Sequence, residues 1–288
     1  MHTLIEQLEL HARENPKETV LFDETVTKGI TYEDLNELSG RVYAWLKQKG
    51  IGKEDFVLIN LTRGVLPVVA IVGILKAGAA FALVEENYAP ERIEYIRKDC
   101  GCRSEINRDA WEEILKCEPL DGHEQTDDHD AAYAIYTSGT TGNPKGVLHE
   151  YGNIEECIKS VNYEGNPLLS DKDRCALLSP MNFVASIMVF FHELYYGGCK
   201  IFIASYKTIK NPLLLKRMFL EKRISFTFLT PSYVRMLGGQ TGPFLKKLLV
   251  GSEPANNIYL DKVDIYNMYA MSESGFLVGV FRIDKPYI

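Results

Sequence analysis

The chain has 288 residues, of which 46% are hydrophobic and 25% are charged, as in an ordinary globular protein. Its formal net charge of −7 argues against non-specific nucleic-acid binding, which needs clustered Lys and Arg to neutralise phosphates. The chain carries six scattered cysteines and lacks a basic, apolar leader, which favours reduced thiols in a cytoplasmic protein.

Helical and strand patterns alternate along the chain. Leu4 and Leu8 share one face of a first helix, which ends before Pro16. The segment Thr31-Tyr-Glu-Asp34 resembles a capping box and opens a helix that ends at Gly50. Further helices are expected at 65–77, 90–97, 154–161, 185–195 and 213–222. Strands are expected at 19–22, 29–31, 56–61, 81–84, 131–136, 175–178, 200–204, 225–229, 248–250 and 263–266.

This alternation predicts an α/β protein with mostly parallel sheets flanked by helices. We expect one large domain over 1–288, with subdomains at 1–180 and 181–288. The longest apolar stretch, 65–84, is interrupted by a proline, glycines and a lysine. A buried helix followed by a turn and a strand explains this stretch better than a membrane span.

The segment Tyr136-Thr-Ser-Gly-Thr-Thr-Gly-Asn-Pro-Lys-Gly146 directly follows an expected buried strand. Its three glycines, four Ser/Thr hydroxyls and one lysine in eleven residues suit a polyphosphate. Glycines let backbone N–H groups approach phosphate oxygens, hydroxyls add donors, and Lys145 supplies positive charge. The common P-loop is excluded because glycine, not Ser or Thr, follows Lys145. A flexible surface loop is the alternative, which the set order of proline and lysine after the run disfavours.

This segment resembles the phosphate loop of the adenylate-forming superfamily: acyl-CoA synthetases, luciferases and the adenylation domains of nonribosomal peptide synthetases. The family's Ser-Gly-Thr-Thr-Gly-x-Pro-Lys-Gly is matched at every position of 138–146. Further landmarks follow the family's order: Ile30-Thr-Tyr-Glu-Asp-Leu35, Leu75-Lys-Ala-Gly-Ala-Ala-Phe81, Phe183-Val-Ala-Ser186, Leu229-Thr-Pro-Ser-Tyr233, Gly251-Ser-Glu253 and Asn267-Met-Tyr-Ala-Met-Ser-Glu273. The chain is thus similar to the large N-terminal domain of such enzymes along its whole length.

The resemblance implies ATP and Mg²⁺ as cofactors. The β- and γ-phosphates would be held by Thr137, Ser138, Gly139, Thr140, Thr141, Gly142 and Lys145. Tyr269 would lie against adenine, Ser272 would donate to the α-phosphate, and Glu273 would bind Mg²⁺. Lys145, Ser272 and Glu273 would form the catalytic set. The other nucleotide contacts would come from Gly251, Ser252, Glu253, Asn267, Met268 and Ala270, the last replacing a family glycine and expected to crowd the nucleotide. Taken alone, Glu273 would be read as a solvated surface acid.

The resemblance also implies where the acid substrate binds. In amino-acid-activating members, the aspartate of Phe-Asp-x-Ser pairs with the substrate ammonium, and this chain has Val184 there. An ammonium buried without a counter-charge is costly, so Val184 disfavours an ordinary α-amino acid. The other pocket positions, none charged, are Ala185, Met188, Phe228, Leu249, Gly251, Met268, Phe276 and Leu277. They favour an aliphatic, aryl, α-hydroxy or α-keto acid, although strands of an ordinary core would also be apolar.

The expected function is ATP-dependent activation of a carboxylic acid to an acyl-adenylate for transfer to a thiol. The thiol would be phosphopantetheine on a carrier protein, or CoA. The family pattern continues beyond Glu273 with a small barrel, a hinge and a mobile C-terminal domain that carries a catalytic lysine, and 274–288 leave no room for these. The alternative is a non-catalytic nucleotide-binding remnant or a subunit of a split synthetase, associating with a missing C-terminal half or with itself. The two functions differ on whether this chain alone turns over.

A zinc site is one alternative for Cys100-Gly-Cys102 together with Cys117, His123 and His129. The spacing fits no common zinc pattern, so a structural zinc is not expected. The sequence also contains neither a Gly-x-Ser-x-Gly nucleophile elbow nor a Gly-x-Gly-x-x-Gly dinucleotide fingerprint.

Overall fold

The structure is a computed structural model that describes residues 3–26, 28–137, 144–170, 172–238, 241–275 and 277–285. The chain divides into two compact units. The first comprises 1–19, 30–156 and 180–183, and the second comprises 20–29, 157–179 and 184–288.

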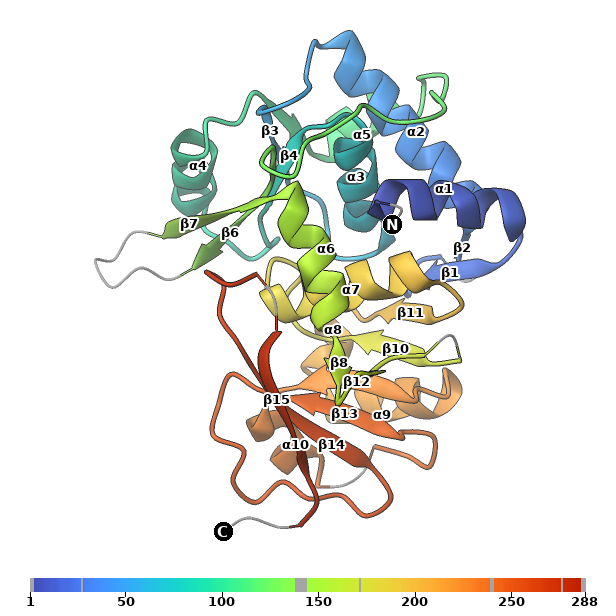
Figure 1. Ribbon diagram of the computed structural model, residues 1–288, viewed down its shortest axis with the longest axis vertical. Helices are drawn as coiled ribbons and strands as arrows, with labels where there is room; N and C mark the ends of the chain where they lie inside the picture. The colour runs from blue at the N-terminus through green and yellow to red at the C-terminus, as the bar shows by residue number, and fades with distance from the viewer. Residues whose placement is uncertain are drawn as a thin grey trace. The chain divides into compact units, whose positions relative to one another are not determined.

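The sheet of the first unit has the strand order β5-β3-β4-β6-β7 (Figure 1). The strands are β3 (Phe56–Ile59), β4 (Ala80–Leu83), β5 (Ser104–Ile106), β6 (Ala131–Thr137) and β7 (Lys145–Glu150). All neighbours are parallel except β6 and β7, which form an antiparallel pair at one edge. A two-residue strand, β2 (Ile30–Thr31), also belongs to this unit.

The helices of this unit are α1 (Leu4–Glu14), α2 (Tyr32–Gln48), α3 (Val65–Lys76), α4 (Pro90–Asp99) and α5 (Arg108–Ile114), and α6 (Tyr151–Ser160) begins in it. The predicted capping box of α2 is confirmed, with Thr31 and Asp34 each bonding the other's backbone N–H. Helix α3 is buried on every side. A Cβ at Gly73 would lie 2.4 Å from the Cβ of Val42, so glycine lets α2 and α3 approach closely.

The sheet of the second unit runs β15-β14-β13-β12-β10-β11-β1. Its strands are β1 (Thr19–Phe22), β10 (Arg174–Leu177), β11 (Lys200–Ile203), β12 (Phe226–Leu229), β13 (Lys247–Val250), β14 (Asp264–Ala270) and β15 (Leu277–Ile283), with a separate hairpin of β8 (Asn162–Tyr163) and β9 (Asn166–Pro167). Neighbours are parallel except for β14 and β15. The predicted fold class is therefore confirmed in both units.

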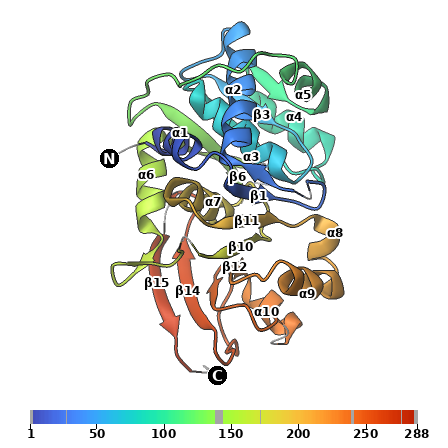
Figure 2. The same ribbon diagram turned by 90° about the vertical axis from the view of Figure 1, so that its right-hand side faces the viewer.

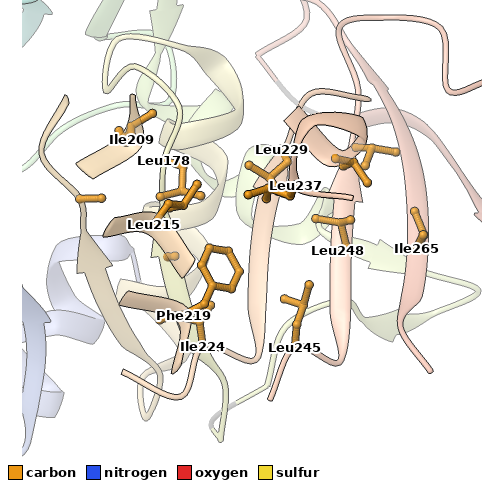
Figure 3. Packing of buried hydrophobic residues seen from close by; sticks show 14 of the residues in the cluster. Leu178, Ile209, Leu215, Phe219, Ile224, Leu229, Leu237, Leu245, Leu248 and Ile265 are labelled. Atoms are coloured by element: carbon orange, nitrogen blue, oxygen red, sulfur yellow. The ribbon is translucent and has the colours of Figure 1, made fainter. Parts of the chain in front are cut away.

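Helices α8 (Tyr206–Ile209), α9 (Pro212–Glu221) and α10 (Pro231–Leu237) gather on one side of the strands of this second sheet (Figure 2). Leu215 and Phe219 of α9 pack there with Leu248 of β13 and Ile265 of β14 (Figure 3). Strand side chains alternate between faces, so Phe228 and Leu249, next to Leu229 and Leu248, point to the opposite face. The second unit also contains the long buried helix α7 (Val184–Tyr196).

The apolar stretch 65–84 forms α3, a turn and β4, as predicted. Within the described ranges, no helix is long and apolar enough to cross a lipid bilayer. The sequence does not predict the following elements: β5, α5, β7, β8, β9, α8, α10 and β15. Strand β7 is largely exposed and lacks the apolar alternation by which a strand is recognised, and α8 spans only four residues.

Candidate functional site

The predicted phosphate-binding segment joins β6 to β7 in the first unit. Ser138, Gly139, Thr140, Thr141 and Gly142 lie outside the described residues. The two ends of the segment are described: Thr137 ends β6, Lys145 begins β7, and the two residues are paired across the antiparallel ladder. Lys145 is exposed and Thr137 is half-buried. The strand pairing therefore fixes the two ends of the predicted loop beside each other.

The base of this hairpin is closed by Tyr136. Its hydroxyl donates to the Oδ2 of Asp99 at 2.8 Å, and its ring is buried. Tyr136 pairs with Gly146 across the ladder, and a Cβ at Gly146 would lie 2.9 Å from the Cζ of Tyr136. The motif's last glycine thus makes room for an aromatic ring. The motif contains Tyr136 and Gly146 but indicates no structural role for either, and it gives no signal for Asp99.

In the second unit, the predicted pocket residues Phe228, Leu249 and Met268 lie near the carboxyl ends of three neighbouring parallel strands. Phe228 of β12 pairs with Leu249 of β13, and both are buried together with Met268 of β14. Gly251 follows β13 directly and is buried too. The carboxyl edge of an open parallel sheet is where α/β proteins bind ligands. The strand register thus gathers these four predicted residues at one edge.

Gly251 is the point of closest approach at this edge. A Cβ there would lie 2.8 Å from the backbone oxygen of Met268 and 3.5 Å from Cε2 of Phe228. A contact under 3.0 Å with a backbone atom cannot be relieved by turning a side chain. Glycine at 251 therefore keeps β13, β14 and the ring of Phe228 in contact.

Val184, Ala185 and Met188 lie in the first two turns of α7 and are buried. The Ser186 hydroxyl donates to the backbone oxygen of Ser179 at 3.3 Å, which fixes the start of α7 beside the segment that follows β10. Leu277, also buried, starts β15 and pairs with Ala270, while Phe276 lies outside the described residues. Every predicted pocket residue that the structure describes is thus apolar or glycine, and buried.

The predicted nucleotide residues at the end of β14 are more open to solvent. Tyr269 is 60% exposed, and Glu273 is exposed while Ser272 is half-buried. The turn after the strand is held by Ser274, whose N–H donates to the Met271 carbonyl at 3.2 Å. Asn267 pairs with Val250 of β13 and is half-buried, like Ala270. The segment 269–273 therefore carries an aromatic ring (Tyr269), a hydroxyl (Ser272) and a carboxylate (Glu273).

Glu253, predicted to bind the nucleotide, is hydrogen-bonded to another residue of the chain, Ser232. Its carboxylate accepts from the Ser232 N–H at 3.1 Å and from the Ser232 hydroxyl, and it lies 3.7 Å from the Arg235 guanidinium. The Ser232 hydrogen bonds lower the pKa of Glu253. The preceding Ser252 has a φ of +70°, in the left-handed region. Ser232 belongs to one of the sequence landmarks, but the landmark does not predict this bond.

The first unit contains a buried carboxylate, Glu85, to which the sequence assigns no role. Glu85, 4% exposed, accepts from the backbone N–H of Met181 at 2.6 Å and of Asn182 at 3.4 Å. The Asn182 side chain in turn donates to the Tyr88 hydroxyl at 2.7 Å. These bonds fix the segment 180–183, which directly precedes Val184. The sequence offers no local signal for them because 96 positions separate Glu85 from Met181.

Across the described part of the chain, no three His, Cys, Asp or Glu side chains come together in a way that could hold a metal ion. Glu273 fits a different kind of magnesium site, in which one or two carboxylates bind the ion and phosphate and water oxygens supply the other ligands. Its exposed carboxylate, next to the Ser272 hydroxyl, has the oxygen chemistry that such a site requires. The residues present therefore fit magnesium that arrives with a nucleotide.

The profile of the family described as "AMP-binding enzyme" matches residues 8–124 and 105–287. Surfactin synthase subunit 1 of Bacillus subtilis is 33% identical over 250 residues, which cover 81% of this chain and 7% of that protein. The NpsA N-terminal subdomain of Klebsiella oxytoca, solved with 3-hydroxyanthranilyl-AMSN, has a TM-score of 0.87 at 21% identity, covering 98% of this chain and 76% of that one. An artificially fused adenylation–PCP di-domain, NpsA-ThdA from the same organism, has a TM-score of 0.86 at 21% identity, covering 98% and 60%.

The structural likenesses agree with the fold described above, and the profile spans both units. The chain spans only a small part of the synthase subunit that it matches. The family assignment suggested by the motifs is therefore confirmed, and the chain belongs to the AMP-binding enzyme family.

Proposed function

We propose that this chain binds ATP with Mg²⁺ and activates an apolar carboxylic acid as its acyl-adenylate. Family membership supports the reaction class. The observation that carries the substrate class is the buried, uncharged set Phe228, Leu249, Gly251 and Met268 at the carboxyl edge of the second sheet. Burying an ammonium among such residues without a counter-charge would be costly.

The proposed division of labour follows the chemistry of each group. Lys145, exposed at the start of β7, supplies positive charge to the departing pyrophosphate. The Ser272 hydroxyl would donate to the α-phosphate, and the Glu273 carboxylate would hold Mg²⁺, which when bound would offset phosphate charge. The substrate carboxylate attacks the α-phosphorus, and pyrophosphate leaves.

The thiol acceptor that we propose is phosphopantetheine on a carrier protein. The NpsA-ThdA structure is a fused adenylation–PCP di-domain, and surfactin synthase subunit 1 is a relative. CoA is the other acceptor consistent with the family. Product analysis with a phosphopantetheinyl carrier protein and with CoA would separate the two.

The test of the reaction is acid-dependent exchange of labelled pyrophosphate into ATP, measured with a panel of aliphatic, aryl, hydroxy, keto and amino acids. We expect exchange with an apolar acid and its loss in Lys145→Ala and Glu273→Ala. Matched controls are Lys207→Ala and Glu112→Ala, which remove exposed charges of the same kind elsewhere. ATP binding without exchange for any acid would instead identify a non-catalytic nucleotide-binding chain.

Val184→Asp tests the substrate class. The variant places a carboxylate where amino-acid-activating members carry theirs, so we expect exchange with an apolar acid to fall about 10-fold or more and α-amino acids to gain activity. Ile187→Asp is the matched control, because Ile187 is also buried on α7 but is not a predicted pocket position. Equal losses in both variants, without any gain for amino acids, would remove Val184 from the pocket.

A further inference from the structure

Cys100 and Cys102 form a pair of neighbouring thiols that the proposed reaction does not use. Their Sγ atoms lie 2.8 Å apart, and both residues are half-buried, whereas Cys157, Cys175 and Cys199 are buried. All six cysteines are free in the structure. Two thiols in contact and partly open to solvent are the arrangement from which an intramolecular disulfide can form.

The local sequence creates this contact. Helix α4 ends at Asp99, and Gly101 follows with a φ of +60°, the left-handed conformation that glycine adopts freely. The Gly101 N–H bonds the Lys98 carbonyl at 3.2 Å, and the Cys102 N–H bonds the Arg97 carbonyl at 3.0 Å. This is the Schellman pattern of a helix end, and it folds the chain so that the side chains on either side of the glycine meet.

The pair lies against the strand that leads into the phosphate loop. Cys100 and Cys102 pack on the cluster that contains Ile96 of α4 and Tyr136 of β6, and α4 lies beside β6 and β7 in Figure 1. The Cys100 S–H donates to the Ile96 carbonyl at 3.0 Å, and the Tyr136 hydroxyl donates to Asp99, the residue next to Cys100. Tyr136 in turn covers Gly146 at the start of β7. One aromatic side chain therefore connects the thiol pair to both strands of the hairpin.

We propose that Cys100 and Cys102 are a redox-sensitive dithiol, oxidised by a low-molecular-weight disulfide such as oxidised glutathione, and that their oxidation loosens the β6–β7 hairpin through Tyr136. Any effect of this loosening on nucleotide binding rests on the proposed function. Disulfide formation and the loosening itself do not. The Cys102 thiol, which is hydrogen-bonded to Cys100, holds the pKa of Cys100 below its usual range, as suits the attacking sulfur.

In this exchange oxidised glutathione is the oxidant, and the thiols of Cys100 and Cys102 are oxidised. The Cys100 thiolate attacks one sulfur of the glutathione disulfide, whose S–S bond breaks and releases one glutathione thiolate. The Cys102 sulfur, on losing its proton, attacks Sγ of Cys100 and displaces the second glutathione. The two cysteines lose two electrons and two protons, and two reduced glutathiones carry them away.

Disulfide formation changes what Tyr136 contacts. The two sulfurs must approach from 2.8 Å to the covalent distance of about 2.05 Å, and the Cys100 S–H no longer exists as a donor. The donation from Cys100 to the Ile96 carbonyl is thereby lost, and the displaced turn weakens the bond between the neighbouring Asp99 and Tyr136 at the base of the hairpin. A typical hydrogen bond changes an opening equilibrium by about 2- to 10-fold, and we expect amide exchange in β6 and β7 to accelerate by that factor.

The experiment incubates the native protein with oxidised glutathione, alkylates the remaining thiols after unfolding, and maps them by mass spectrometry. We expect loss of the two alkylatable thiols at 100 and 102, no retained glutathione on them, and full recovery with dithiothreitol. Cys117→Ser is the matched control, because Cys117 is also half-buried, and it should leave this loss unchanged. Cys100→Ser should leave Cys102 alkylatable, and Cys102→Ser should keep glutathione bound to Cys100, because no second thiol is there to displace it. Alkylatable Cys100 and Cys102 in the treated wild type, or glutathione persisting on either, would overturn the dithiol.

Hydrogen exchange of 131–137 and 145–150 is then compared between the reduced and oxidised protein. We expect the acceleration in the wild type and none in the Cys100→Ser/Cys102→Ser double variant. Identical exchange in both redox states of the wild type would overturn the coupling through Tyr136. Neither readout uses ATP, so a chain that formed no acyl-adenylate would still give a result in both.

Discussion

The hairpin of the first unit and the carboxyl edge of the second sheet are built by different means. The hairpin relies on the pairing of Thr137 with Lys145, which are close in sequence, and on one polar contact, from Tyr136 to Asp99, 37 positions away. The carboxyl edge relies on apolar packing between Phe228, Gly251 and Met268, which three strands supply. A motif can therefore identify the first region, whereas the second exists only once the strands are in register.

The largest expected effect is a loss of stability at the carboxyl edge, which apolar packing holds together. Gly251→Ala places a methyl group 2.8 Å from the backbone oxygen of Met268, so β13 and β14 must separate. We expect the free energy of unfolding to fall by about 2 kcal/mol, as for other overpacked sites. Urea unfolding followed by fluorescence measures this change.

Gly279→Ala is the matched control, because nothing lies within 4 Å of a Cβ at that position on β15. It should change stability by no more than about 0.5 kcal/mol. Equal stabilities of the two variants would mean that β13 and β14 can move apart at little cost. Close packing at Gly251 would then not be what holds the carboxyl edge together.

The next effect tests a polar contact in the first unit. Glu85→Ala leaves the buried N–H of Met181 without its acceptor, and such a loss typically costs about 1–3 kcal/mol. Glu85→Gln keeps an acceptor oxygen and should retain most of the stability. If glutamine were as damaging as alanine, the negative charge rather than the acceptor would be what the segment 180–183 requires.

How much the sequence could predict follows from the same contrast. The start of α2 at Thr31 and the proline at the start of α4 were predicted correctly, because both signals are local. The phosphate-loop motif was found because its residues are consecutive. Strand β7 was missed because most of its side chains are exposed and show no apolar alternation.

Long-range contacts had no such signal. The approach of Gly251 to Met268 depends on the register of β13 and β14, which a list of apolar residues does not contain. Ser232 and Glu253 meet because α10 and the segment after β13 start at neighbouring strand ends, 21 positions apart in sequence. Cys100 and Cys102 were considered only as metal ligands, because the left-handed turn that joins their thiols becomes visible in the structure.

The smallest effect is a pH dependence of the first unit. His123 of the segment before β6 lies 3.2 Å from the Glu9 carboxylate of α1, and this hydrogen bond raises the pKa of His123, with Glu6 adding to the shift and Lys76 opposing it. Burial alone would raise the pKa of Glu9, but the bond to His123 and the positive charges nearby outweigh it, and the pKa is lowered. The contact therefore joins two charged groups over a definite pH window.

The sign of the effect follows from the two shifts. The contribution of His123 is fully present below its unfolded pKa of about 6.5 and is lost as pH rises through the raised value. The contribution of Glu9 is present above about 4.5 and is lost as pH falls through the lowered value. We expect His123→Gln to lower the free energy of unfolding by about 0.5 kcal/mol near pH 5.5 and to have less effect near pH 8.5.

His129→Gln is the control, because the side chain of His129, which pairs with Glu150, is 91% exposed and water screens that pair. Its effect on stability should be smaller than that of His123→Gln at pH 5.5. Unfolding measured for both variants at the two pH values separates them. A His123→Gln effect that grew as the pH rose would reverse the sign required by a protonated His123, and the contact would then stabilise the first unit through packing instead of charge.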